Sequence, residues 1–590
     1  MRSVMMNMEF GGKFAFADFF SFTESVSCGK LYHGVIWRIN IAGGRKVTIL
    51  SFFGTGKFGD LTSYFSMDYL MFFLPLVILI YSFLGGRQKK YLLLIVSYLF
   101  FALISGGLVM YLLLTTLSMF FLGQWIERLH LEEKAVLGTV EKERKKAVKA
   151  KYMHRKRLVL GLAALLHIGL LLVLKYSGFF MENVNAVLAV MKVPVQFEIP
   201  QFVMPIGISF FTMQAVSYMF DVYRGTIKAE KNFWKLALFI SFFPQIVEGP
   251  ICRYEQTADQ LWNVKSIEHK NLVFGLQRIL FGMMKKIVIA DRLNPLIKEV
   301  FANFANYDGG VVALAAVCYT IQLYMEFSGT MDAVIGSAQI FGVKLPENFA
   351  RPFFSKTISD FWARWHITLG GWFKDYIFYP VTLSKPVKKL TGNLKKKTGN
   401  YFALLVASAI ALFCVWFCNG LWHGAAWNYI FFGMYHFGLI LMGNMVEPLA
   451  KRIRKALHIN VEHFAYRLFQ MLRTSILVVI GELFFRCHGL KSGLIMFKMM
   501  LTEFSFAGFS LDSIEALGMD WRDIVVTVVA LLIVLITSIL KERGTELREM
   551  LAKRPVAVRW AAMYGLILFI VMFGAYGLGY IPVDPIYANF

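Results

Sequence analysis

The sequence has few charged residues, and this scarcity is the first fact that bounds its structure. Of 590 residues only 17% are charged, whereas 57% are hydrophobic and the mean hydropathy is +0.56. Soluble globular domains carry about 25% charged residues. A soluble globular fold is therefore excluded.

Several catalytic and metal-binding signatures are also missing. The six cysteines contain no CxxC pair, and the eleven histidines contain no HxxxH or HxxHH pair. A metal-dependent membrane oxidase or desaturase needs closely spaced histidines, so no metal site is expected. The absence of a GxSxG elbow disfavours a covalent acyl-serine. The two halves of the chain share no convincing similarity, whereas transporters are typically built from repeats.

Long apolar runs are what the sequence does contain. A run of 17 to 25 apolar residues is long enough to cross a bilayer as a helix. Clear runs lie at 68–86, 158–177, 202–220, 402–418, 427–445, 471–486, 523–540 and 558–578, and less clean ones at 91–105, 107–123, 232–247, 272–290 and 310–327. The pattern predicts an all-α, polytopic membrane bundle of roughly 11–13 spans with additional re-entrant or amphipathic helices.

The net charge of +24 is concentrated between the apolar runs. Lys and Arg cluster at 87–90, 128–157, 384–397, 451–455 and 541–559. Such clusters mark cytoplasmic loops and attract anionic lipid head groups, so membrane lipids are expected partners. No nucleic-acid partner is expected, because a basic patch of this kind is common to membrane proteins.

Residues 1–66 differ from the rest of the chain in composition and show no sustained periodicity. The stretch 54–59 matches GxGxxG, but an apolar span follows at once instead of a helix and a second strand, so it predicts no nucleotide site. We expect 1–66 to be a poorly structured extension or a start-site artefact. The functional domain is expected to cover 67–590.

Two apolar segments are interrupted by Pro and Gly. Residues 204–224 and 244–256 carry such breaks, and the second contains Gln245, Glu248 and Arg253. Irregular backbone at membrane depth must be packed in protein or line a cavity. A re-entrant element is expected near 240–256, with a plain extramembrane turn as the alternative.

A third group of polar residues lies on an apolar helix. Glu326, Ser328 and Asp332 occur within residues 322–354. Acidic groups cost about 2.5 to 3.5 kcal/mol each inside a membrane helix, so they are expected to face the interior or water. A structural role as caps is an equal alternative.

Two histidines stand out as functional candidates. His366 lies within FWARWHITLGGWFKDYIFYP, and His423 lies within WFCNGLWHGAAWNYIFFGMYHFGLI. An unpaired polar group in apolar surroundings costs roughly 2 to 7 kcal/mol. Asn419 lies one helical turn before His423, Trp422 adjoins it, and small residues follow, which leaves room for a ligand. His436 and His167 are instead expected to be hydrogen-bonded core residues.

These motifs resemble the membrane-bound O-acyltransferase family, and within it the bacterial branch that contains alginate O-acetyltransferase and the D-alanyl-teichoic-acid transferase. The resemblance covers about 67–590 and rests on PIGISFFTMQAVSYMFDVYRG, PQIVEGPICRYEQ, FSGTMDAVIG with PENFARPF, FWARWHITLGGWFKDYIF and GLWHGAAWNYIFFGMYH. It implies a bundle with a central tunnel, an essential His423 and a second hallmark histidine at His366. The chain departs from the family at Glu326, at Thr330-Met331 and in the basic insert 383–399.

Acyl transfer from a thioester to a hydroxyl needs a base, donors for the oxyanion and exclusion of water. His423 is the expected base, and His366 is expected to bind or orient a substrate group. The candidate substrate-binding residues are Asn419, Trp422, Arg364, Gln245, Glu248, Ser328 and Asp332. No tightly bound cofactor is expected, and the co-substrate is an acyl thioester, either acetyl-coenzyme A or an acyl-carrier protein.

The sequence therefore predicts a multi-pass plasma-membrane enzyme. It would move an acyl group, chiefly acetyl, from a cytoplasmic thioester to a hydroxyl of a surface polysaccharide or of an extracytoplasmic SGNH-type partner transferase. D-alanyl transfer to teichoic acid from a carrier protein is the enzymatic alternative. A polytopic transporter or flippase is the non-enzymatic one.

Overall fold

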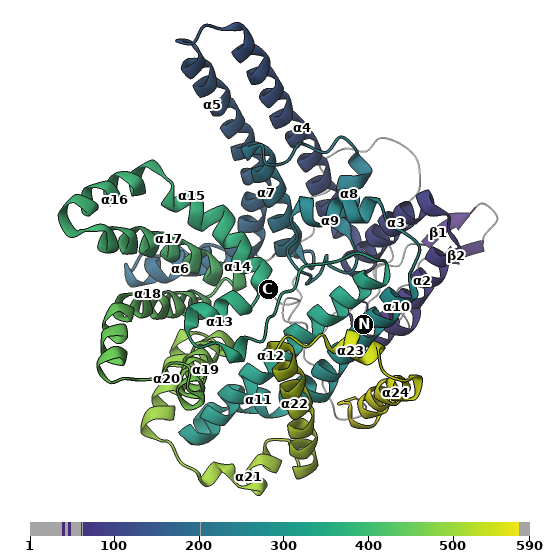
Figure 1. Cartoon of the computed structure of the whole chain (residues 1–590), viewed down its shortest axis with the longest axis vertical. Coiled ribbons are helices and arrows are strands. Elements are labelled where there is room, and N and C mark those ends of the chain that lie inside the picture. The colour runs from purple at the N-terminus through teal and green to yellow at the C-terminus, as the bar shows by residue number, and fades with distance from the viewer. Residues whose placement is uncertain (1–37, 42–44, 49–60, 62, 201, 577–590) are drawn as a thin grey trace. The chain divides into compact units, whose positions relative to one another are not determined.

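The computed structural model describes residues 38–41, 45–48, 61, 63–200 and 202–576 (Figure 1). The chain divides into two compact units, Met1–Gly59 and Asp60–Phe590. The described part of the first unit is an antiparallel ladder of β1 (Arg38–Ile41) and β2 (Arg45–Thr48). The stretch 54–59 and most of the proposed extension 1–66 lie outside the described residues, so their assignment stays a prediction.

The described residues of the second unit are helical wherever they have regular secondary structure. Its first half contains η2 (Asp68–Phe73), α2 (Leu74–Phe83), α3 (Gly86–Ser105), η3 (Gly106–Leu108), α4 (Val109–Thr139), α5 (Lys145–Ala164), η4 (Leu165–Gly169), α6 (Leu170–Val190), α7 (Ile208–Arg224), α8 (Phe233–Ser241), α9 (Tyr254–Trp262), α10 (His269–Met283), η5 (Met284–Ala290), α11 (Asp291–Ala302) and η6 (Phe304–Asn306). Its second half contains α12 (Gly309–Ile340), η7 (Pro352–Phe354), α13 (Ile358–Arg364), α14 (Ile367–Phe373), η8 (Lys374–Phe378), α15 (Tyr379–Thr382), α16 (Lys385–Thr398), α17 (Asn400–His423), α18 (Trp427–Ala456), α19 (Phe464–Arg486), α20 (Leu490–Thr502), η9 (Ala507–Phe509), α21 (Leu511–Ala516), α22 (Trp521–Glu542), α23 (Leu547–Ala552) and α24 (Val556–Phe573).

Eight helical segments of the described chain are long and apolar enough to cross a membrane. They are Gly86–Thr139, Lys145–Val190, Gly309–Ile340, Asn400–His423, Trp427–Ala456, Phe464–Arg486, Trp521–Glu542 and Val556–Phe573. The all-helical, multi-pass class is confirmed. The eight segments are fewer than the roughly 11–13 spans that the sequence predicted. The reason is that some apolar runs share one segment, whereas others form shorter or interrupted helices, such as α7 and α8. The central tunnel stays a prediction.

Helix α12 lies at the centre of the packing. Its N-terminus is capped by Asp308, whose Oδ1 accepts hydrogen bonds from Gly310 N (2.8 Å) and Val311 N (3.0 Å). Such a cap satisfies two of the four amide groups that a helix leaves open at its start. Most residues of α12 are buried. Figure 1 shows this helix among the other helices of the second unit.

Glycines bring α10 against α12. Gly275 faces Gly336 across the contact, and Gly282 faces Gly329. A methyl group at any of the four positions would lie only 2.5–2.8 Å from the carbonyl oxygen of its opposite glycine. Small residues at this spacing are the usual means by which membrane helices approach closely.

The interrupted segment between α8 and α9 is buried throughout. Every residue from 236 to 252 is buried, although the backbone leaves the helix after Ser241. Gly207, at φ 78°, lies against Ile246, where a Cβ would collide with the carbonyl oxygen. This packing favours the re-entrant interpretation over an exposed turn, because irregular backbone away from water must be enclosed by protein.

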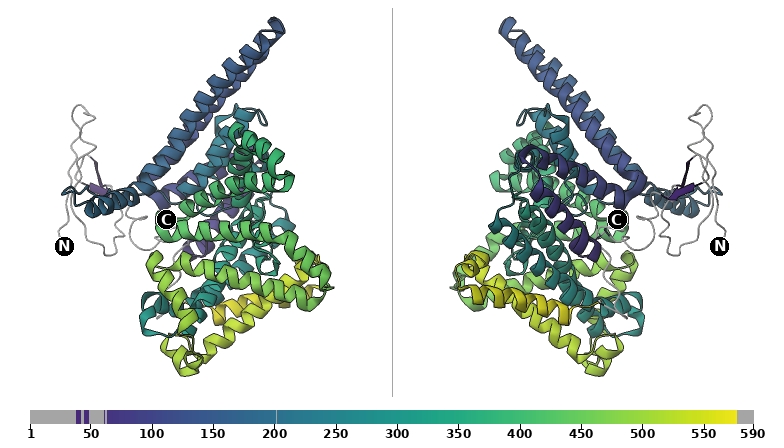
Figure 2. Two further views of the ribbon diagram at one scale, coloured as in Figure 1. Left: turned by 90° about the vertical axis from the view of Figure 1, so that its left-hand side faces the viewer. Right: turned by 90° about the vertical axis from the view of Figure 1, so that its right-hand side faces the viewer.

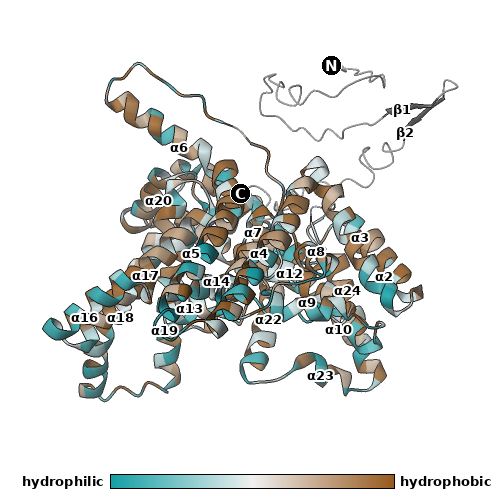
Figure 3. Ribbon diagram, turned by 90° about the horizontal axis from the view of Figure 1, so that it is seen from above, coloured by the Kyte–Doolittle hydropathy of each residue, from teal (hydrophilic) through white to brown (hydrophobic). Residues whose placement is uncertain are grey.

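The basic region 128–157 forms the tip of a helical hairpin. Helices α4 and α5 run side by side and project from the rest of the second unit (Figure 2). Lys156 is buried between them and pairs with Glu133 at 2.7 Å. Figure 3 shows by hydropathy that spanning helices such as α17 are largely hydrophobic, whereas α16 is largely hydrophilic.

The acidic residues of α12 are paired with buried cations. Asp332 accepts from Arg278 Nε (2.8 Å) and pairs with Lys285 Nζ (2.5 Å), and Lys285 also donates to Ser328 Oγ (3.0 Å). Glu326 pairs with Lys286 at 2.9 Å. These contacts are structural, but they are ion pairs and a hydrogen bond within the bundle and not the helix caps considered from the sequence.

Removing Asp332 leaves two buried cations with fewer partners. We expect Asp332→Ala to lower the free energy of unfolding by about 3–5 kcal/mol, the usual cost of breaking a buried ion pair. The exposed Asp512→Ala is the control and should unfold as the wild type does. Thermal unfolding of the purified protein measures both. Wild-type stability in Asp332→Ala, combined with weaker substrate binding, would restore the substrate-binding role.

Candidate functional site

His423 is the last residue of α17 and is buried. Two residues of α6 hold this end of the helix: Lys175 Nζ donates to Trp422 O (2.6 Å), and Tyr176 Oη donates to Leu421 O (2.5 Å). The last carbonyl groups of a helix have no partner within it and favour a nearby cation. The position of His423 is therefore set by α6 as well as by its own helix.

Aromatic rings surround the imidazole of His423. Trp422, Phe485 and Phe432 have ring centroids 4.9, 5.0 and 6.0 Å from it. Phe432 comes from α18 and Phe485 from α19, so three helices meet at this ring. The following residue, Gly424, packs against the Tyr429 ring, where a Cβ would collide. Gly424 is therefore small because the Tyr429 ring packs against it. The sequence pattern could not distinguish this packing from room for a ligand.

His366 occupies the turn between α13 and α14 in a left-handed conformation, with φ 47° and ψ 52°. A non-glycine residue in this region costs of order 1–3 kcal/mol and persists only where its surroundings enforce it. The side chain is buried, and burial lowers the pKa of His366 to about 3. The imidazole is therefore neutral at physiological pH.

Asn348 enforces the turn at His366. Its Oδ1 lies 3.2 Å from His366 Nδ1 and also accepts from Thr368 N (3.1 Å) and Thr368 Oγ1 (3.0 Å). Its backbone oxygen accepts from Ile367 N at 3.0 Å. A carbonyl oxygen only accepts, so Nδ1 carries the proton and Nε2 presents its lone pair. Nε2 is buried and has no hydrogen-bond partner among the described residues.

The two histidine motifs meet at Trp422. The indole centroid lies 5.7 Å from the His366 ring and 4.9 Å from the His423 ring, and Phe210 of α7 covers it at 5.6 Å. Asn419, one turn earlier on α17, is also buried, and within the described chain its Oδ1 accepts no hydrogen bond. An unsatisfied buried polar atom costs about 1–3 kcal/mol. Asn419 Oδ1 and His366 Nε2 are two of several such atoms in the described chain, and His366 contacts Trp422, which lies on the same helix as Asn419.

The other predicted site residues have protein partners. Arg364 pairs with Asp360 and Glu542, each at 3.0 Å, and Gln245 donates to Phe239 O at 3.1 Å. Glu248 is buried in the interrupted segment. Ser328 accepts a hydrogen bond from Lys285, and Asp332 pairs with the same lysine. A substrate role for these five residues stays a prediction. Among the described residues, no group of three or more His, Cys, Asp or Glu side chains is arranged to hold a metal ion.

His436 and His167 are core residues as expected. Trp362 Nε1 donates to His436 Nδ1 (3.3 Å), and Ser118 Oγ lies 3.3 Å from His167 Nε2. Sequence reasoning missed Asn348 as the partner of His366. The only signal for Asn348 in the sequence was that a polar residue lies inside the PENFARPF motif. The contact itself joins positions 18 residues apart through a turn that only the fold defines, so the sequence did not predict it.

Fold and site together define a multi-pass membrane protein with two buried histidines brought together inside a helical bundle. The model of the membrane-bound O-acyltransferase family matches residues 226–480. The probable alginate O-acetylase of Pseudomonas syringae pv. tomato is 31% identical over 462 residues, which are 78% of this chain and 79% of that protein. The chain belongs to the membrane-bound O-acyltransferase family, and it is an O-acyltransferase that uses an acyl donor as co-substrate.

The names of two further relatives give two different polymers, peptidoglycan and teichoic acid. The peptidoglycan O-acetyltransferase of Helicobacter pylori is 30% identical over 372 residues, covering 59% of this chain and 65% of that protein. The teichoic acid D-alanyltransferase of Bacillus subtilis is 32% identical over 254 residues, covering 42% of this chain and 61% of that protein.

Asn348→Ala tests whether the turn at His366 matters for catalysis. Loss of one oxygen that serves three donors should misplace the imidazole and lower the transfer rate by about 10²-fold, the effect of a displacement of about 1 Å at a reacting centre. The rate is measured as incorporation of labelled acyl group per folded molecule. The exposed Asn303→Ala is the control. A wild-type rate in Asn348→Ala would mean that the position of His366 is not critical.

Proposed function

We propose that the protein transfers an acetyl group from a cytoplasmic thioester, acetyl-coenzyme A, to a hydroxyl of a surface polysaccharide or of an extracytoplasmic SGNH-type transferase. The observation that carries this proposal is the buried meeting of His366, Trp422 and His423, where His366 Nε2 has no hydrogen-bond partner in the described chain. The alginate and peptidoglycan acetyltransferase relatives support acetyl as the group and a polysaccharide as the final acceptor.

His423 acts as the general base. Its neutral imidazole takes the proton of the acceptor hydroxyl while the hydroxyl oxygen attacks the thioester carbonyl. The carbon–sulfur bond then breaks, and the departing thiolate recovers the proton. No covalent acyl-enzyme is needed in this scheme.

The neighbouring residues position the reactants. Trp422 carries an indole N–H and Asn419 an amide, both suited to stabilise the oxyanion that forms on the carbonyl oxygen. His366 presents a lone pair at Nε2, which accepts a hydrogen bond from a substrate hydroxyl or amide. The aromatic rings of Phe432 and Phe485 exclude water, which strengthens these interactions.

A central tunnel allows donor and acceptor to remain on opposite sides of the plasma membrane. The basic connectors indicate cytoplasmic loops by the positive-inside rule, which supports a cytoplasmic entrance for the thioester. D-alanyl transfer from a carrier protein to teichoic acid is the second candidate, favoured by the Bacillus subtilis relative. The same two histidines serve either reaction, because both join an acyl thioester to a hydroxyl.

His423→Ala tests the base. The variant should insert and fold normally but lose about 10² to 10⁴ in transfer rate, the usual contribution of a general base. His167→Ala is the matched control, since it also removes a buried imidazole but lies on η4. It should keep the wild-type rate per folded molecule. Full activity in His423→Ala would exclude the proposed role.

The donor is identified by labelling. Membranes containing the protein are incubated with labelled acetyl-coenzyme A or with labelled D-alanyl carrier protein, and the polymer and protein fractions are then counted. Label from acetyl-coenzyme A in polysaccharide or in a partner protein supports the proposal, whereas label only from the D-alanyl carrier supports the second candidate. Solute uptake by reconstituted vesicles without acyl turnover would favour a transporter.

A further inference from the structure

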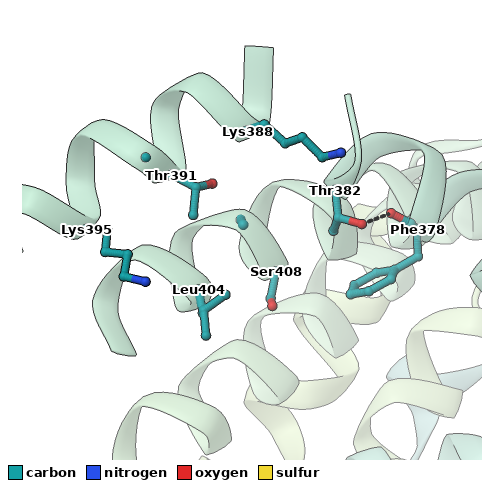
Figure 4. A pocket seen from close by; sticks show the side chains of 9 residues that line it. Phe378, Thr382, Lys388, Thr391, Lys395, Leu404 and Ser408 are labelled. Atoms are coloured by element: carbon teal, nitrogen blue, oxygen red, sulfur yellow. Dashed lines mark hydrogen bonds between the residues drawn. The ribbon is translucent and has the colours of Figure 1, made fainter. Parts of the chain in front are cut away.

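A pocket of about 300 Å³ lies between α16 and the first turns of α17. Figure 4 shows Lys388, Thr391 and Lys395 projecting from α16 on one side of it, with Leu404 and Ser408 of α17 on the other. Its remaining edge is formed by η8 and α15, where Thr382 Oγ1 donates to Phe378 O at 3.1 Å. We call this the α16 pocket.

The charge around the α16 pocket is all of one sign. Helix α16 contains no acidic residue and six lysines, at 385, 388, 389, 395, 396 and 397. No carboxylate of the described chain forms an ion pair with any of them, whereas the cations of α10 and η5 are paired. Like charges at helical spacing destabilise a helix, so a bound anion would stabilise α16.

The other wall of the pocket is apolar and continues along a spanning helix. Leu404 and Ala407 of α17 form this wall together with Ser408, and Leu404 is 54% exposed. α17 is among the segments long and apolar enough to cross a membrane. The pocket therefore joins a cationic surface to an apolar one, which matches a molecule with an anionic head and an acyl tail better than a soluble anion.

The pocket is separate from the acyl-transfer site. Leu404 precedes His423 by 19 residues on one continuous helix, which is about 28 Å at 1.5 Å per residue. A ligand head held at Lys388 and Lys395 therefore lies at the opposite end of α17 from the histidines.

We propose that the α16 pocket binds the phosphate head group of an anionic phospholipid. Lys388 and Lys395 pair with the phosphate, and the hydroxyl of Ser408 donates to its oxygens or to the glycerol. The first acyl carbons lie along Leu404. The lipid fixes α16 to α17 and thereby anchors this end of the spanning helix at the membrane surface.

The experiment compares two double variants of the full chain. Lys388→Gln with Lys395→Gln removes both pocket lysines. Lys389→Gln with Lys396→Gln removes the same charge at the same seven-residue spacing, but turned by about 100° around the helix and away from the pocket. Each protein is purified in detergent, and its thermal stability and retained lipid are measured with added phosphatidylglycerol, phosphatidylcholine or glycerol phosphate.

Phosphatidylglycerol should stabilise the wild type and the control pair more than phosphatidylcholine does. The pocket variant should bind phosphatidylglycerol about tenfold to thirtyfold more weakly, the loss expected for two lysines near an anionic head group. Equal losses in the two variants would overturn the proposal in favour of a diffuse field. Equal stabilisation by glycerol phosphate and by the lipid would also overturn it, because the acyl tail would then contribute nothing.

Discussion

The site depends on keeping polar side chains in place where water is excluded. Inside an apolar bundle an imidazole loses its hydration, and each nitrogen must find another partner or remain available for a substrate. At His366 these two outcomes occur in one ring, because Nδ1 is held by Asn348 while Nε2 has no partner in the described chain. The protein thus orients the ring through one nitrogen, and in the proposed reaction the other nitrogen accepts a hydrogen bond from the substrate.

The rest of the bundle serves to hold that arrangement. The left-handed turn at His366 persists because Asn348 bonds the imidazole ring and the two residues that follow it, Ile367 and Thr368. The end of α17 is fixed by donors from α6, which places Trp422 between the two imidazoles. Neither histidine is positioned by its own helix alone, so the geometry of the site follows from the packing of several helices.

Much of this could be predicted from the sequence, for identifiable reasons. Apolar length predicts membrane helices, and the cost of burying a polar ring singles out His366 and His423. The Pro and Gly breaks near 240–256 predict the irregular stretch that is buried there. The ion pairs of Asp332 and the pairing of Arg364 with Glu542 could not be predicted, because each joins residues from distant segments of the chain. In a sequence motif, a charged side chain that binds substrate cannot be told from one that pairs with another side chain.

The distribution of charge shows why paired and unpaired groups must be treated differently. In the interior, Asp332 is matched by Arg278 and Lys285, because an uncompensated charge there would cost several kcal/mol, about 3–5 when one partner is lost. On α16 the lysines lack carboxylate partners in the described chain, and they tolerate this because the helix is exposed. Exposure alone does not explain why six like charges gather beside an apolar wall, since dispersed lysines would be solvated equally well. A negatively charged membrane surface would supply the missing counter-charge, and the proposed lipid would then be part of the electrostatic balance of the protein.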